Sequence, residues 1–240
     1  MGHSGVRAMT GAVRVRTLTD ADISSAAALH REVLDTEFLS RYGVAFMRTY
    51  YRAWCHAPGA IALAALDQDN DLVGAVLGAV DPAAHTRAMV RRYGIRLAGL
   101  LMVRALVDPA LAKDLLVTRA RRYLRGLARL AYPTSRKSRS STGYPAMGEI
   151  THVLVRPGNQ GSGIGRALLD AAVATGVNAH LDELVLVTPP QGGARAFYER
   201  LGWLSAGTVV SRSGESFVRY RLPLPTTDAA GSRPSPSVQD

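Results

Sequence analysis

The stretch Glu149–Ala171, which reads E-I-T-H-V-L-V-R-P-G-N-Q-G-S-G-I-G-R-A-L-L-D-A, decides the fold. Its apolar and β-branched first part, Ile150–Val155, predicts a strand, and Pro157-Gly158 ends it. Apolar residues recur at three- and four-residue spacing from Ile164 onward, which predicts a helix. A strand therefore runs through a short turn directly into a helix.

The turn between this strand and helix contains Gly161, Gly163 and Gly165. Glycine has no Cβ, so backbone N–H groups can approach a ligand closely there. The first N–H groups of a helix lack partners within the helix, and the helix dipole places partial positive charge at the same end. Both features favour a bound phosphate or pyrophosphate.

Two common phosphate-binding motifs do not fit this turn. A Walker loop continues with Gly-Lys-Ser/Thr, whereas this turn continues with Gly165-Arg166-Ala167. A dinucleotide-binding G-x-G-x-x-G motif needs a third glycine, and the registers that begin at Gly161 and Gly163 place Arg166 and Leu168 there. The pattern therefore disfavours NTP hydrolysis and dinucleotide binding.

Two segments carry a resemblance to a known family. Gln160-Gly161-Ser162-Gly163-Ile164-Gly165 resembles the acyl-CoA loop of the GNAT N-acetyltransferase superfamily, whose pattern is Q/R-x-x-G-x-G/A. Ala194–Trp203, A-R-A-F-Y-E-R-L-G-W, resembles the later helix of that family, which ends in Y-E-x-x-G-W/F. The resemblance implies an α/β fold with a mixed sheet, the GNAT-like acyl-CoA N-acyltransferase fold, and an enzyme that uses acetyl-CoA as cosubstrate without a metal. The alternatives are a glycine turn without a ligand and an ordinary helix that ends at Gly202.

The chemistry implied by the resemblance is direct attack of an amine on the acetyl-CoA thioester. An alkyl ammonium is almost wholly protonated at pH 7, so a carboxylate should accept its proton. Glu149 is the candidate, because it lies four residues before Val153, where some GNAT members place their base. Strand alternation predicts one face for Glu149 and Val153 and the opposite face for His152. Tyr198 resembles the general acid of the family, which protonates the departing thiolate; an exposed glutamate and a buried tyrosine are the alternative interpretations.

The resemblance also implies the contacts with acetyl-CoA. The backbone of Val153, Leu154 and Val155 would pair with the pantetheine arm, and an amide there would polarise the thioester carbonyl. The diphosphate would lie on the loop formed by Gln160, Gly161, Ser162, Gly163, Ile164, Gly165 and Arg166. Gln191 stands where the family often has an asparagine that binds the pantetheine arm, so this position departs from the family pattern.

The length of the chain and the spacing of its expected elements predict one domain. A chain of 240 residues with 47% hydrophobic content is large enough for a single hydrophobic core. The domain should span residues 13–222, between a flexible leader, 1–12, and a disordered tail, 223–240, rich in Pro, Ser, Thr and Ala. We expect strands at 13–18, 60–66, 72–80, 150–155, 184–188, 208–211 and 216–222. We expect helices at 21–34, 39–55, from 162 and at 193–201.

An insertion of about 65 residues, 82–146, separates the third and fourth expected strands, which GNAT members usually connect directly. Its pattern is helical, with an amphipathic helix around 111–127. Residues 87–139 hold 14 lysines and arginines against Asp108 and Asp114, while the whole chain carries +10, so the basic charge is confined to this segment. Three interpretations stay open: a helical lid, an arginine site for an acidic substrate or the 3′-phosphate of CoA, and a surface for anionic lipid or nucleic acid.

Several classes of partner and site are disfavoured. No nucleic-acid-binding module is seen, so no nucleic acid is expected. The histidines show no metal-ligand spacing, and no metal site is expected. The longest apolar run in the middle, Leu97–Val103, is far shorter than the ~20 residues of a membrane span. The single cysteine, Cys55, excludes an internal disulfide and, with no signal peptide seen, favours the cytoplasm.

The expected acceptor is a primary amine of a small molecule. A protein lysine or N-terminal amine, and a non-catalytic acyl-CoA sensor, are the alternatives. The insertion allows contact with a membrane surface, and a homodimer is also allowed. The aromatic residues Tyr42, Tyr50, Tyr51 and Trp54 recur at helical spacing, which favours a core role over an acceptor pocket.

Overall fold

A seven-stranded mixed sheet forms the centre of the computed structural model, which describes residues 13–35, 38–114, 145–211 and 214–225. The strand order is β1-β2-β3-β4-β5-β7-β6, and every neighbouring pair is antiparallel except β4 and β5. The strands are β1 (Arg14–Thr17), β2 (Ala60–Leu66), β3 (Leu72–Ala79), β4 (Met147–Val155), β5 (Glu183–Thr188), β6 (Leu204–Val210) and β7 (Ser216–Pro223).

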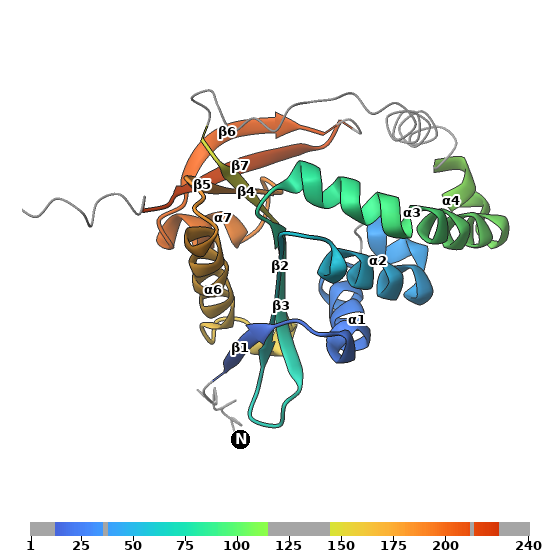
Figure 1. Ribbon diagram of the computed structural model, residues 1–240, viewed down its shortest axis with the longest axis horizontal. Coiled ribbons are helices and arrows are strands. Elements are labelled where there is room, and N and C mark those ends of the chain that lie inside the picture. Colours follow the sequence, from blue (N-terminus) through green and yellow to red (C-terminus); the bar gives the residue numbers. More distant parts are fainter. Residues whose placement is uncertain (1–12, 36–37, 115–144, 212–213, 226–240) are drawn as a thin grey trace, which may run out of the picture.

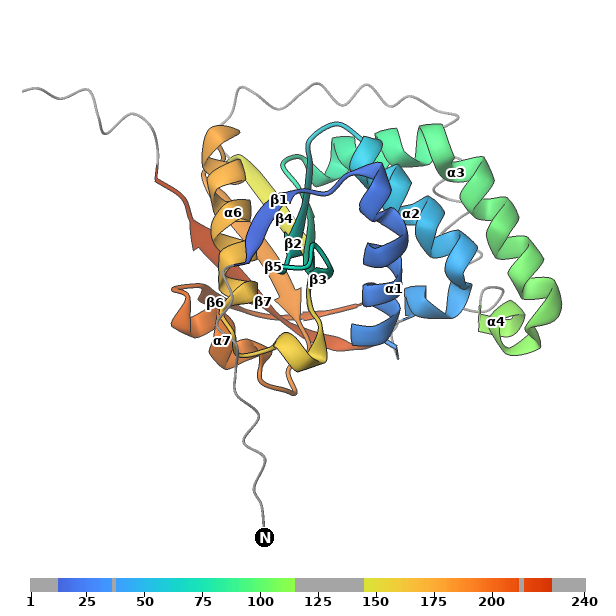
Figure 2. The same ribbon diagram turned by 90° about the horizontal axis from the view of Figure 1, so that it is seen from below.

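Helices cover both faces of this sheet (Figures 1 and 2). One layer contains α1 (Ile23–Val33), α2 (Val44–His56) and α3 (Pro82–Val107), and the opposite layer contains α6 (Ile164–Asn178) and α7 (Ala194–Arg200). Each layer buries its own apolar core against the sheet. β2 and β3 are buried almost throughout because helices pack on both of their faces, which explains their unbroken apolar sequences.

The order of elements confirms the GNAT-like α/β fold expected from the sequence. Two boundaries differ by four residues or more from the prediction. The helix expected at 39–55 is divided into a short 3₁₀ turn, Phe38–Tyr42, and α2, because Gly43 has φ +87°, which lies outside the helical region. The strand expected at 208–211 begins earlier, at Leu204, because β6 is exposed on both faces and has no alternating apolar pattern.

The insertion after β3 is helical where the structure describes it. It contains α3 and the short α4 (Pro109–Asp114), and α3 packs beside α2. Asp81 caps α3 by accepting a hydrogen bond from the Ala84 amide (2.9 Å), and Pro82 occupies the first helical position. Leu101 and Leu111 are buried in the core, as the lid interpretation requires.

Some predicted features lie outside the described residues. These are the leader 1–12, most of the amphipathic segment at 111–127, the basic run near 135–141 and the end of the tail. Within the described part, no helix combines the length and apolarity that crossing a membrane requires.

An ion pair between Arg16 and Asp22 connects β1 to the turn that precedes α1. The carboxylate of Asp22 accepts hydrogen bonds from both Arg16 Nη atoms (2.6 and 2.9 Å) and from the Thr19 amide (2.8 Å). These contacts, the Arg16 guanidinium above all, lower the pKa of Asp22 to about 2. The ionised carboxylate therefore ties the turn that precedes α1 to β1.

Candidate active site

The strands β4 and β5 run side by side and then diverge. They pair in parallel only from Met147 opposite Glu183 to Ile150 opposite Leu186. Beyond this point β4 continues to Val155 paired with β3 alone, while β5 continues paired with β7. The divergence leaves one edge of β4 without a strand partner in the middle of the sheet.

The unpaired edge of β4 presents backbone groups to this opening. Arg156 N–H donates to the carbonyl of Val73 on β3 (2.9 Å). Because hydrogen-bonding direction alternates along a strand, Leu154 also faces β3, whereas Val153 and Val155 face the opening. The Val155 carbonyl already accepts a hydrogen bond from Gln160 Nε2 (3.3 Å). An extended ligand could pair with Val153 as an added strand would.

A bulge interrupts β4 just before this opening. His152 lies opposite Leu77, but Ile150 lies opposite the next residue, Gly78, so Thr151 is the extra residue of β4. A bulge of one residue reverses the parity of the side chains that follow it. Ile150 packs in the α6 layer before the bulge, and Val153 packs in the same layer after it.

The prediction for His152 is therefore wrong, because strict alternation placed it on the face opposite Glu149. Ile150 faces α6, so its neighbour Glu149 faces the α1–α3 layer. His152 lies on that layer as well, with its ring 4.8 Å from His30 and 6.5 Å from Trp54. The expected shared face of Glu149 and Val153 is lost for the same reason.

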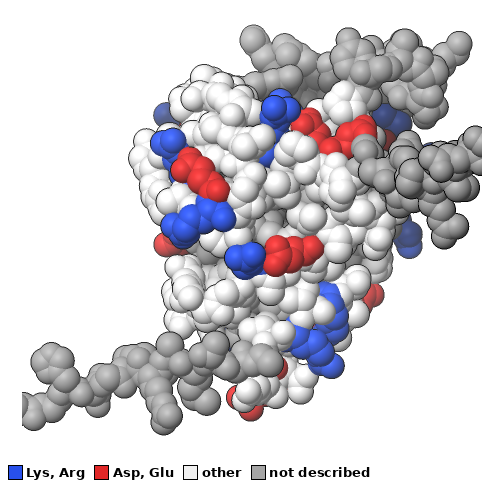
Figure 3. Space-filling view, turned by 90° about the vertical axis from the view of Figure 1, so that its left-hand side faces the viewer, with Lys and Arg blue, Asp and Glu red and all other residues white. Residues whose placement is uncertain are grey.

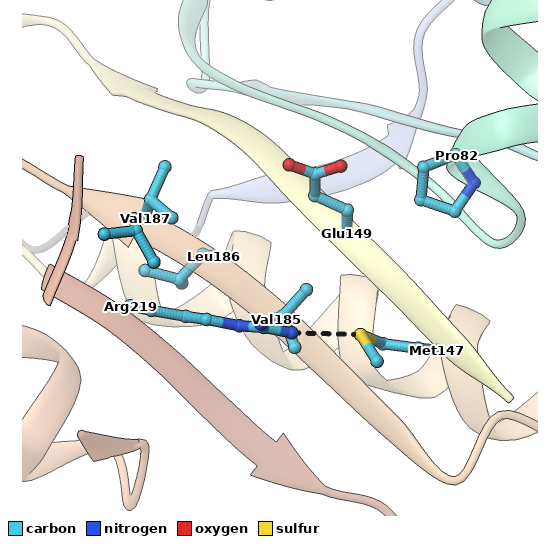
Figure 4. A pocket seen from close by; sticks show the side chains of 8 residues that line it. Pro82, Met147, Glu149, Val185, Leu186, Val187 and Arg219 are labelled. Carbon is cyan, nitrogen blue, oxygen red and sulfur yellow. Dashed lines mark hydrogen bonds between the residues drawn. The ribbon is translucent and has the colours of Figure 1, made fainter. Parts of the chain in front are cut away.

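Glu149 lines a cavity of about 300 Å³ on this face of the sheet (Figure 4). The lining residues are Pro82, Met147, Glu149, Val185, Leu186, Val187, Val209 and Arg219. In Figure 4 the Glu149 side chain projects from β4 with Pro82 at one side, and Arg219 extends toward Met147, whose sulfur it contacts at 3.2 Å. Burial raises the pKa of Glu149, while the charges of Arg219 and His152 act in the opposite direction. The group is thus a half-buried carboxyl at a cavity wall.

Tyr198 lies on α7 in the opposite layer. Its side chain is buried among Phe197, Trp203 and Tyr220, with ring centroids 5.3, 6.1 and 5.8 Å away. Burial raises its pKa to about 12, so the phenol stays protonated at neutral pH. Its hydroxyl makes no hydrogen bond to a described residue, and a ligand could therefore supply one.

The two segments that carry the family resemblance meet in space. A Cβ built on Gly165 in the first turn of α6 would lie 3.1 Å from the Phe197 ring and 3.6 Å from Val155. The end of β4, the start of α6 and α7 are thus in contact. A side chain at Gly165 would push these three elements apart, which gives this glycine a packing role.

The turn between β4 and α6 has the geometry of a phosphate cradle. Gly161 and Gly163 have φ angles of +78° and +87°, and no atom lies within 4 Å of a Cβ built on either. Gly163 is the N-cap of α6, and no side chain caps that helix end. The residues present therefore fit a diphosphate, which exposed amides and the helix N-terminus would hold. Arg166 is exposed beside the turn and lies 3.7 Å from Asp170.

Other predicted residues have less structural support. Gln191 is exposed in the turn between β5 and α7 and forms no contact that would assign it to the site. Burial raises the pKa of Cys55 to about 12, so it offers no thiolate. Across the described residues, no cluster of three or more His, Cys, Asp or Glu could hold a metal ion.

The structure also adds residues that the sequence did not single out. Arg219 comes from β7 and Pro82 from α3, and both reach Glu149 only in the folded chain, whereas Met147 lies two residues before Glu149 on β4. No local pattern marks them. That His152 lies on the same face as Glu149 could have been predicted only by anticipating the bulge.

Comparisons with known proteins support the resemblance to the GNAT family. The model of the acetyltransferase (GNAT) family matches residues 124–203, which include the whole β4 to α7 unit. This matched segment, about a third of the chain, is similar to the GNAT acetyltransferases. The matched segment and the shared fold indicate an acyltransferase enzyme. A search of curated proteins finds no match.

Solved structures share the fold of this chain. A GNAT-family acetyltransferase from Desulfovibrio desulfuricans is 17% identical, with a TM-score of 0.52 over 88% of this chain and 99% of that chain. The acetyltransferase yncA of Salmonella typhimurium, solved with acetyl-CoA, is 14% identical, with a TM-score of 0.52 over 89% and 95% of the two chains. Chaetomium thermophilum Naa20, solved with a bisubstrate analogue, is 20% identical, with a TM-score of 0.51 over 88% and 86%.

Proposed function

We propose that this enzyme transfers an acetyl group from acetyl-CoA to a primary amine of a small molecule. The observation that carries the proposal is the opening between β4 and β5, which leads to the uncapped glycine turn and lies next to Glu149. Acetyl-CoA supplies the acetyl group as a thioester. Val153 and Val155 would align the pantetheine arm, and the amides from Gly161 to Arg166 would hold the diphosphate. Gln191 stays a candidate contact for the pantetheine arm.

Glu149 would accept the proton of the acceptor ammonium, directly or through a water molecule. Burial moves the pKa of Glu149 toward neutral pH, and a general base is most effective when its pKa is near the working pH. Arg219 and His152 limit that rise and keep the group able to ionise. The amine then becomes neutral within the cavity, next to the sheet opening.

Two further groups would assist bond breaking. A β4 amide at the opening, such as that of Val153, would donate a hydrogen bond to the thioester oxygen, where negative charge develops. Tyr198 would give its proton to the departing sulfur. A thiolate needs a proton donor that is still protonated at neutral pH, and the high pKa of Tyr198 meets this condition.

The size and walls of the cavity favour a small acceptor. A volume of about 300 Å³ falls at the lower end of the range for small-molecule sites. Pro82, the first residue of α3, forms part of the wall, so the insertion narrows the acceptor side. An N-terminal peptide is the second candidate, because the NatC complex bound to Gag peptide and CoA shares this fold. The one-cysteine chain also fits a cytoplasmic enzyme.

The direct test is release of free CoA thiol from acetyl-CoA with a panel of small amines and N-terminal peptides. Turnover should occur with a small amine, and Glu149→Gln and Tyr198→Phe should each lower it. Glu32→Gln, an exposed position on α1, is the matched control and should not. Turnover with peptides alone would replace the acceptor assignment, and acetyl-CoA binding without turnover on any amine would favour a sensor.

A further inference from the structure

A second cavity, of about 220 Å³, lies between α2 and α3, on residues that do not line the Glu149 cavity. It is lined by Ala45, Arg48, Thr49, Arg52, Arg96 and Leu100. Arg48 and Arg52 are one turn apart on α2, and Arg96 approaches from α3. Half of the lining is therefore arginine, contributed by two helices.

The three arginines have no acidic partner among the described residues. The buried Thr49 hydroxyl donates to the Ala45 carbonyl (2.9 Å) within α2. On the face shown in Figure 3, in contrast, basic and acidic side chains lie next to one another. Three guanidinium groups around one cavity repel each other unless an anion lies between them, and their planar forks suit phosphate oxygens.

An exposed apolar surface borders this cavity. Five large apolar side chains of α3 are exposed: Ile95 (93%), Leu106 (81%), Val107 (69%), Met102 (64%) and Val103 (64%). They make up half of the large apolar side chains that the described part of the chain exposes. Figures 1 and 2 show α3 on the outside of the helical layer, next to α2. A concentrated patch of this kind marks a surface for a partner or a membrane.

Helical spacing joins the two features. Arg96 and Val103 are seven residues apart, so both lie on the same side of α3, at the flank of the apolar surface. Arg91 and Arg92 are exposed one turn before Ile95 and Arg96. Cations therefore surround one end of the apolar surface, and the arginine cavity opens along its flank.

We propose that the outer face of α2 and α3 binds an anionic lipid bilayer. A lipid phosphate would occupy the cavity between Arg48, Arg52 and Arg96, while Ile95, Met102, Leu106 and their neighbours enter the region between headgroups and acyl chains. A free phosphate compound would satisfy the arginines but leave the apolar side chains in water, whereas a lipid covers both. The inference does not rest on the proposed activity.

The test is cosedimentation of the full chain with vesicles of phosphatidylcholine alone, and with vesicles that also contain phosphatidylglycerol. Binding should require phosphatidylglycerol and weaken with salt. The triple variant Arg48→Gln, Arg52→Gln, Arg96→Gln should bind about 100-fold more weakly, since each arginine near an anionic surface contributes about fivefold. The variant Ile95→Gln, Met102→Gln, Leu106→Gln should lose at least about tenfold without a change in charge.

A matched control removes the same charge elsewhere. The control is the triple variant Arg14→Gln, Arg200→Gln, Arg221→Gln, whose three positions are exposed and lie outside this face. It should retain vesicle binding. Unchanged thermal unfolding of each variant shows that it is folded. Vesicle binding that survives both α2–α3 variants would overturn the proposal, because another basic segment would then carry it. Titration with glycerol phosphate gives the other contrary result: saturable binding that the arginine variant abolishes, with no vesicle binding.

Discussion

The substitution Gly163→Ala separates a ligand-binding turn from a merely flexible one. Gly163 has φ +87°, and a Cβ built on it meets no atom within 4 Å. Gly214, in the turn between β6 and β7, has φ +88° and equally open surroundings, so Gly214→Ala is a matched control. Alanine in the left-handed region costs about 1–2 kcal/mol, partly offset by the lower entropy of its unfolded chain. Both variants should therefore lose about 1 kcal/mol of stability.

The two variants should differ in their affinity for acetyl-CoA. A methyl group on the turn keeps the diphosphate from approaching the amides, and a hydrogen bond to a charged group contributes about 1.5–3 kcal/mol. Losing one such bond weakens binding by about 10- to 100-fold. Isothermal titration with acetyl-CoA measures the affinity, and urea unfolding measures the stability. Equal acetyl-CoA affinities of the two variants would refute the assignment of the turn.

Three further predictions concern single side chains. Glu149→Gln should lower kcat/KM by about 10²- to 10⁴-fold at pH 7 and remove the acid limb of the pH–rate profile, whose midpoint lies above the ordinary glutamate pKa. Because burial raises the pKa of Glu149, its ionisation destabilises the fold as pH rises through that pKa. Urea unfolding should therefore show the variant to be more stable than the original protein at pH 8 but not at pH 4. Tyr198→Phe should lower kcat by about 10- to 100-fold in the thiol-release assay, with little change in melting temperature because no described residue forms a hydrogen bond with its hydroxyl. Asp22→Asn should lower the free energy of unfolding by about 1–2 kcal/mol at pH 7. The lowered pKa of Asp22 gives a stabilisation that is present above the ordinary aspartate pKa and is lost as pH falls toward 2. Calorimetric scans from pH 7 to 2 should therefore show the stability difference between the two proteins vanish.

The glycine turn and the strands around it could be predicted because their signals are local. Backbone freedom at Gly161 and Gly163, and the apolar period of α6, are written in consecutive residues. The buried strands β2 and β3 are continuous apolar runs, so their bounds are close to those predicted. The aromatic residues of α2 were assigned to the core, and Tyr50, Tyr51 and Trp54 are buried there.

The rest of the site depends on tertiary structure. A bulge at Thr151 depends on how β4 pairs with β3, which strand alternation cannot reveal, and this placed His152 on the wrong face. Arg219 and Pro82 reach Glu149 from elements far apart in the chain. The arginine cavity requires α3 to pack beside α2, whereas the sequence showed only that the insertion is basic and helical.

The most direct test of the central claim is a crystal structure of the protein with acetyl-CoA. The account predicts the diphosphate within hydrogen-bonding distance of the amides from Gly161 to Arg166, and the pantetheine arm paired with Val153 in the opening between β4 and β5. A cofactor bound elsewhere, with the turn empty or filled by a side chain of the protein, would contradict it.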